Sequence, residues 1–174
     1  RQSVRLATME HMRPSDIVTM ESFENAILVH AAISGSTNCL LHLPAIAHEF
    51  GIEITGDTFD RLHRNARYLL DVRPAGRWPA ECFYYAGGVP RVMEEIKDML
   101  HLDVMTVTGK TIAENIQGVV NKNPEVIRPV ENPYSKTGGI AVLKGNLAPD
   151  SAVVKRSAVV PEMMVHEGPA RVFD

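Results

Sequence analysis

Apolar side chains recur at helical spacing over most of the first 118 residues. Between residues 20 and 33 they share one face at i, i+4, i+7 and i+8, and Thr19 is a suitable N-cap in front of them. We therefore expect a helix that stops at Ser34-Gly35. A second helix is expected over residues 36–51, with a kink at Pro44.

Three further helices are expected along this region. Thr55 opens a segment that continues as a helix to residue 66, and residues 89–100 have the clearest amphipathic pattern. Thr111 and Glu114 have the spacing of a capping box, which predicts one more short helix.

The pattern changes after residue 120. Residues 121–137 contain three prolines and no helical period, which predicts a linker or an extended crossover. Beyond it the chain is rich in β-forming residues, and these forty residues of short strands cannot close a sheet with all edges protected. We expect a helix-rich α/β chain whose tail begins a β domain. The expected extended segments are 52–54, 103–108, 140–143, 152–160 and 163–165.

Composition narrows the class of protein. The 174 residues are 45% hydrophobic and 22% charged, as in ordinary globular domains. A net charge of -3 gives no broad basic footprint, so we expect no nucleic-acid partner. No apolar run approaches the length that spans a bilayer, so we expect no membrane partner and a cytoplasmic setting. Two cysteines, Cys39 and Cys82, are too few for a cysteine-rich metal site.

The segment Ser34-Gly35-Ser36-Thr37-Asn38 is the most informative candidate for chemistry. Small residues there leave backbone amides accessible at the start of an apolar helix, which favours a bound carboxylate or phosphate. The alternative is that Ser36 and Thr37 only cap the helix, and spacing alone favours capping.

Other motifs are incomplete. Thr108-Gly109-Lys110-Thr111 lacks the earlier glycine of a phosphate loop, because Val104 stands in that position. His48-Glu49 lacks the second histidine of a zinc-protease motif, and we expect all seven histidines to be ordinary surface or partly buried residues. The glycine pairs at 87–88 and 138–139 allow either close backbone approach to a ligand or simple turns, and turns are the favoured expectation.

Several strings resemble one family over nearly the whole chain, in the same order. They are FENAILVHAAISGSTNCLLHLPAIAHEFGI, YYAGGVPRVMEEI, LDVMTVTGKTIAENI and GGIAVLKGNLAPDSAVVKRSAV. They resemble the iron–sulfur dehydratases, which include dihydroxy-acid, phosphogluconate and sugar-acid dehydratases. Two strings, FYYAGGVPRVMEEIKDMLHLDVMTVTGKT and PEMMVHEGPARVFD, look closest to the aldonate branch, of the xylonate dehydratase type.

The resemblance implies a hydro-lyase that converts a small sugar acid such as xylonate to a 2-keto-3-deoxy acid. It implies an iron–sulfur cluster and Mg²⁺ as cofactors, and a homo-oligomer, either a dimer or a tetramer. The alternative within the family is a dihydroxy-acid dehydratase of branched-chain amino-acid synthesis.

The resemblance also divides the chain. Residues 1–120 correspond to the later part of an N-terminal α/β domain, 121–137 to a linker, and 138–174 to the first strands of a β-barrel-like C-terminal domain.

Only Ser36, Thr37 and Asn38 match a family motif that lies beside the active-site cavity, so these three are the expected substrate-binding residues. The chain contains no Cys-Asp-Lys motif, and Cys39 and Cys82 do not match the family's cluster motifs. We therefore expect no catalytic residue and no metal ligand within it.

The chain begins at Arg1 without methionine and stops at Asp174 in an apparent strand, so we expect a fragment that is inactive alone. Two alternatives stay open. The chain could be a free-standing module whose helix starts at Ser36 and Thr111 bind a small anion, or it could be a segment that serves oligomerisation.

Overall fold

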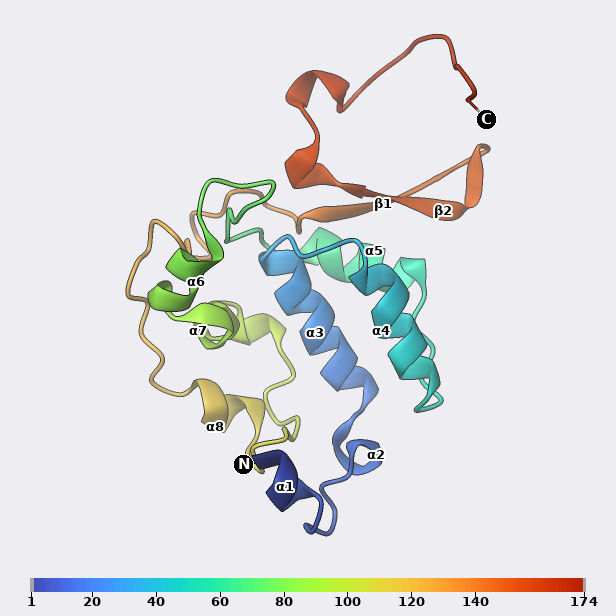
Figure 1. Cartoon of the computed structure of the whole chain (residues 1–174). Helices are drawn as coiled ribbons and strands as arrows, with labels where there is room; N and C mark the ends of the chain where they lie inside the picture. The colour runs from blue at the N-terminus through green and yellow to red at the C-terminus, as the bar shows by residue number, and fades with distance from the viewer. Residues whose placement is uncertain (1, 174) are drawn as a thin grey trace.

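The computed structural model describes residues 2–173 and confirms a mixed α/β chain, with helices followed by a two-stranded antiparallel sheet near the C-terminal end (Figure 1). The helices are α1 (Gln2–Leu6), α2 (Pro14–Ile17), α3 (Met20–Ala32), α4 (Cys39–His48), α5 (Gly56–Asn65), α6 (Ala80–Ala86), α7 (Gly88–Glu95) and α8 (Ile112–Ile116). The strands are β1 (Ile140–Gly145) and β2 (Ala148–Lys155), and short 3₁₀ turns cover Lys97–Met99, Arg156–Ala158 and Pro161–Met163.

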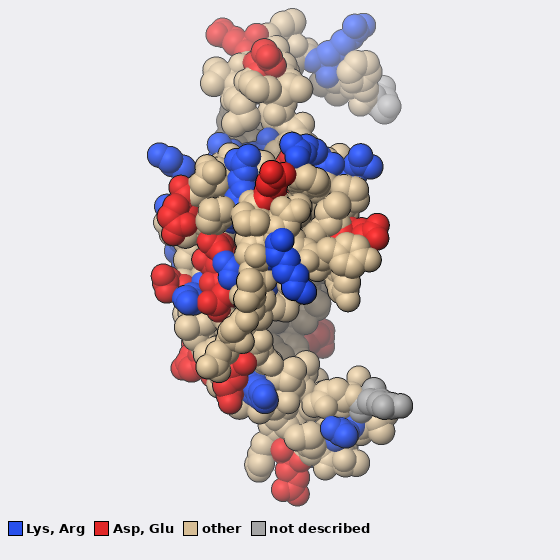
Figure 2. Space-filling view, turned by 90° about the vertical axis from the view of Figure 1, so that its left-hand side faces the viewer, with Lys and Arg blue, Asp and Glu red and all other residues tan. Residues whose placement is uncertain are grey.

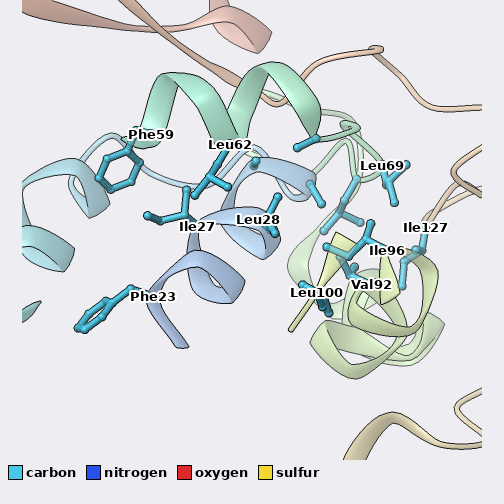
Figure 3. Packing of buried hydrophobic residues seen from close by; sticks show 14 of the residues in the cluster. Phe23, Ile27, Leu28, Phe59, Leu62, Leu69, Val92, Ile96, Leu100 and Ile127 are labelled. Atoms are coloured by element: carbon cyan, nitrogen blue, oxygen red, sulfur yellow. The ribbon is translucent and has the colours of Figure 1, made fainter. Parts of the chain in front are cut away.

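Helix α3 forms the centre of the fold. Thr19 caps it as expected, since its hydroxyl accepts a hydrogen bond from the backbone N–H of Ser22. Ile27 and Ala31 on its apolar face are fully buried. The core around α3 also takes side chains from α5 and α7 (Figure 3). It includes Phe23, Leu28, Phe59, Leu62, Val92, Ile96 and Leu100.

The capping signals of two more helices are confirmed. The hydroxyl of Thr55 accepts from the N–H of Thr58 at the start of α5. At the start of α8, Thr111 and Glu114 form the reciprocal capping box. These local bonds satisfy amides that would otherwise lack a partner in the first helical turn.

Three helix boundaries differ from expectation by more than one residue, and one of them is the end of α4 at His48 rather than at residue 51. Helix α4 begins at Cys39 rather than residue 36, because a tight turn comes first, in which the Cys39 N–H donates to the Ser36 carbonyl at 3.1 Å. Helix α7 ends at Glu95, and residues 97–99 continue as a 3₁₀ turn. The expected proline lies inside α4, at Pro44.

Four expected strands are wrong in whole or in part. Residues 52–54 form no strand, and 103–108 form a loop with only an isolated bridge between Met105 and Thr111. Strand β2 stops at Lys155 rather than reaching residue 160. Lys155 pairs with the first residue of β1, the Arg156 N–H still donates to the Gly139 carbonyl at 2.9 Å, and the chain then enters the 3₁₀ turn Arg156–Ala158. The segment around 163 is a 3₁₀ turn that starts at a proline, which cannot donate to a ladder. The expected strand at 140–143 is confirmed within β1.

Residues 121–137 form an extended crossover that is packed rather than free. Val126 and Ile127 are fully buried, and the Arg128 N–H donates to the Leu69 carbonyl at 3.0 Å. The Tyr134 N–H donates to the Tyr68 carbonyl at 2.8 Å. The crossover thus links the helical part to the hairpin, where β1 packs against α5.

The surface carries both signs of charge. On the face shown in Figure 2, lysine and arginine side chains are interspersed with aspartate and glutamate. None of the helices within residues 2–173 is both long and apolar enough to cross a membrane.

Candidate functional site

The segment between α3 and α4 turns sharply at Ser34, which has a φ of 50°. Positive φ is uncommon for a residue with a side chain. The Ser34 hydroxyl contacts the Ser157 hydroxyl at 2.8 Å, so the turn is held against the segment that follows β2. Gly35 comes next, and a Cβ there would lie 2.2 Å from Cδ2 of His30, so the close approach requires glycine.

The three expected substrate-binding residues lie together on the surface just after this turn. Ser36, Thr37 and Asn38 are all exposed. The Ser36 hydroxyl accepts from the Asn38 N–H at 3.2 Å, whereas the Asn38 side chain makes no capping hydrogen bond to α4. Ser36 therefore stabilises the turn rather than capping the helix, and substrate binding by these residues stays a prediction.

Ser36 and Thr37 line a hollow of about 450 Å³, whereas Asn38 does not. Two cationic side chains, Arg73 and Lys155, line the same hollow. The remaining lining residues are apolar or small: Ile33, Ser34, Gly35, Leu70, Val72, Pro74 and Phe83. A hollow with hydroxyls, two positive charges and an apolar wall suits a small carboxylate that carries an alkyl group.

Beneath the turn lies a pair of buried histidines. His30 at the end of α3 is 5% exposed, and His63 at the end of α5 is 2% exposed. Nδ1 of His30 lies 3.2 Å from Nε2 of His63. On the outer sides, Nε2 of His30 lies 2.8 Å from the Ser36 carbonyl oxygen, and the Ile140 N–H donates to Nδ1 of His63 at 3.3 Å.

These contacts fix the tautomers of both rings. Because Nδ1 of His63 accepts from a backbone N–H, its proton sits on Nε2, which donates to Nδ1 of His30. His30 then carries its own proton on Nε2 and donates it to the Ser36 carbonyl. With both imidazoles neutral, each of the four ring nitrogens has a hydrogen-bond partner.

Burial keeps both rings neutral. Burial lowers the pKa of His63 to about 4, and the neighbouring His30 adds to this effect. Burial also lowers the pKa of His30, although its hydrogen bond to the Ser36 carbonyl opposes the shift. A proton on either ring would add a positive charge to a buried site.

Gly138 and Gly139 hold the β1 hairpin against the histidines. A Cβ at Gly138 would lie 2.8 Å from Nδ1 of His63, and one at Gly139 would lie 2.0 Å from the Ser34 hydroxyl oxygen. This pair was expected to form a turn, but its role is close backbone approach. Sequence reasoning also missed the histidine pair; its one signal was the place of His30 on the apolar face of α3.

The helix start at Thr111 offers no room for an external anion. The Glu114 carboxylate accepts from the Thr111 N–H at 2.8 Å, so the chain supplies its own negative charge there. The hydrogen bond to the Thr111 backbone lowers the pKa of Glu114.

Residues 2–173 contain no group of three or more His, Cys, Asp or Glu side chains that could hold a metal ion. Cys39 in α4 and Cys82 in α6 are both free thiols. Two cysteines are fewer than the set of thiolates that holds an iron–sulfur cluster.

Two family models match the chain. One, described as dihydroxy-acid/6-phosphogluconate dehydratase N-terminal, matches residues 1–115, and its C-terminal counterpart matches residues 125–174. Among curated relatives, the dihydroxy-acid dehydratase of Acetivibrio thermocellus is 56% identical over 165 residues, which is 94% of this chain and 30% of the relative. That of Clostridium kluyveri is 57% identical over 94% of this chain and 30% of the relative. That of Caldicellulosiruptor bescii is 51% identical over 98% of this chain and 33% of the relative.

The expected assignment to the xylonate-type, sugar-acid branch is wrong, because these relatives are all named dihydroxy-acid dehydratase. The strings that suggested it span residues 83–111 and 161–174, and of these only Phe83 lines the hollow. They therefore carry little information about a ligand there. The chain spans about a third or less of the length of these relatives, and it belongs to the dihydroxy-acid/6-phosphogluconate dehydratase family.

Proposed function

We propose that this chain is a segment of a dihydroxy-acid dehydratase, a hydro-lyase that removes water from a branched 2,3-dihydroxy acid to give a 2-keto acid. The observation that carries the proposal is the identity of 51–57% to relatives of that name over 94–98% of the chain. The apolar wall of the hollow beside Ser36 and Thr37 supports an alkyl-bearing substrate over a polyhydroxylated one.

Within this function the chain's residues bind and orient the substrate. Arg73 and Lys155 supply positive charge for the substrate carboxylate, while Ser36 and Thr37 offer hydroxyl and amide groups. Asn38, the N-cap residue of α4, belongs to the predicted substrate-binding set but lies outside the lining of the hollow.

The family resemblance implies an iron–sulfur cluster and Mg²⁺, and in this proposal their ligands come from outside these 174 residues. The chain by itself is then inactive. The cytoplasmic location and the dimeric or tetrameric state remain predictions.

A chimaera tests the proposal. The 174-residue chain replaces the matching segment of the Acetivibrio thermocellus enzyme, and keto-acid formation is measured from 2,3-dihydroxy-3-methylbutanoate and from xylonate. We expect turnover of the branched acid. An inactive chimaera that is folded, assayed beside an active parent enzyme, would contradict the proposal, and so would a preference for xylonate.

A further inference from the structure

We propose that His30 and His63 are positioning residues, which hold the Ser36–Thr37 peptide in one orientation through a chain of hydrogen bonds that starts on the β1 hairpin. Their effect on catalysis rests on the function proposed above, whereas the hydrogen-bond chain itself does not.

The hydrogen bonds all run in one direction, from donor to acceptor. It runs from the Ile140 N–H to Nδ1 of His63, from Nε2–H of His63 to Nδ1 of His30, and from Nε2–H of His30 to the Ser36 carbonyl. Each ring uses one nitrogen as acceptor and the other as donor, so neither can rotate or change tautomer without losing two buried hydrogen bonds. The histidines therefore connect the hairpin to the surface turn as a single unit.

The last of these hydrogen bonds, from His30 to the Ser36 carbonyl, sets the orientation of a peptide group at the hollow. The Ser36 carbonyl accepts from both His30 and the Cys39 N–H, so it points into the protein. In a planar trans peptide the N–H points opposite to the carbonyl, so the N–H of Thr37 points away from His30. Thr37 lines the hollow, and its amide is thereby held as a donor for a substrate oxygen.

The backbone of two glycines approaches both rings closely. Glycine at 35 lies against the ring of His30, and glycine at 138 lies against Nδ1 of His63. The Gly138 N–H also donates to the backbone carbonyl of His63 at 2.7 Å, so the hairpin holds His63 at both its backbone and its ring.

The first test reads the tautomers directly by ¹⁵N NMR of the 174-residue chain, with signals assigned from the His30→Gln and His63→Gln variants. At pH 7 we expect both rings neutral and protonated at Nε2, with a scalar coupling across the N–H···N bond between them. A proton on Nδ1 of either ring, or a cationic ring at pH 7, would overturn the proposal.

The second test separates positioning from folding in the chimaera. Gln and Met have similar length, but only Gln can donate to the Ser36 carbonyl. We expect His30→Met to lower kcat/KM on the order of tenfold and His30→Gln to retain most of it. The same pair of substitutions at the exposed His48 of α4 should change nothing.

Equal activity of the two His30 variants, both folded by circular dichroism, would overturn the positioning role. The Thr37 amide signal gives a second reading in the isolated chain, where it should shift in His30→Met and stay near its original position in His30→Gln. If the unmodified chimaera is inactive, the proposed function fails, and the NMR results alone then decide this proposal.

Discussion

Acidification from pH 7 to pH 5 should destabilise the chain through His63. The ring has a pKa of about 4 when folded and an ordinary value of 6.5 when unfolded. At pH 5 the unfolded state therefore binds nearly a full proton at this ring and the folded state about a tenth of one. Because the unfolded state binds more protons, stability falls as pH falls from 7 towards 4, and the loss is complete below the folded pKa.

The loss from His63 between pH 7 and pH 5 is about 2 kcal/mol. For a chain of this size it lowers the midpoint of thermal unfolding by about 4–8 °C. The pKa of His30 is lowered too, so its contribution has the same sign. Other charged groups face the pair: Asp60 raises the pKa of His63, and Lys155 lowers that of His30.

Thermal unfolding followed by circular dichroism at several pH values between 5 and 7 measures this loss. The His63→Gln variant, which cannot titrate, should lose less stability on acidification than the original chain by about 2 kcal/mol. The exposed His48→Gln should keep the original slope. An unchanged slope in His63→Gln would refute a neutral, buried His63.

Three further predictions concern separate parts of the chain. Gly35→Ala places a methyl group against the His30 ring and should cost about 1–3 kcal/mol of stability, measured by chemical unfolding, whereas Gly145→Ala, whose Cβ meets nothing within 4 Å, should cost under about 1 kcal/mol. Equal costs for the two would contradict the close approach. Thr111→Ala removes the α8 cap and should cost about 1 kcal/mol in the same assay; no change would mean that the capping box contributes nothing. Arg73→Gln in the chimaera should raise KM for the dihydroxy acid with a smaller effect on kcat, and an unchanged KM would remove Arg73 from the carboxylate site.

Local signals in the sequence predicted local structure well. The caps at Thr19, Thr55 and Thr111 work as expected because each depends on atoms within three residues. The buried face of α3 could likewise be predicted from the spacing of its apolar residues.

Features that depend on distant partners could not be predicted in this way. The run 152–160 contains four valines and predicts one continuous strand, but β2 ends at Lys155, where its partner strand begins. His30 and His63 are 33 positions apart, and His63 and Ile140 are 77 apart, so only the folded chain brings them together. The segment 34–38 was identified from its composition, whereas the cations Arg73 and Lys155 beside it come from unrelated parts of the sequence.

The most direct test of the proposed function is the ratio of kcat/KM for 2,3-dihydroxy-3-methylbutanoate to that for xylonate in the chimaera. The identity to relatives named dihydroxy-acid dehydratase and the apolar wall of the hollow predict a ratio well above one, close to that of the Acetivibrio thermocellus enzyme measured alongside. A ratio below one in an active chimaera would contradict the assignment of this chain to a dihydroxy-acid dehydratase.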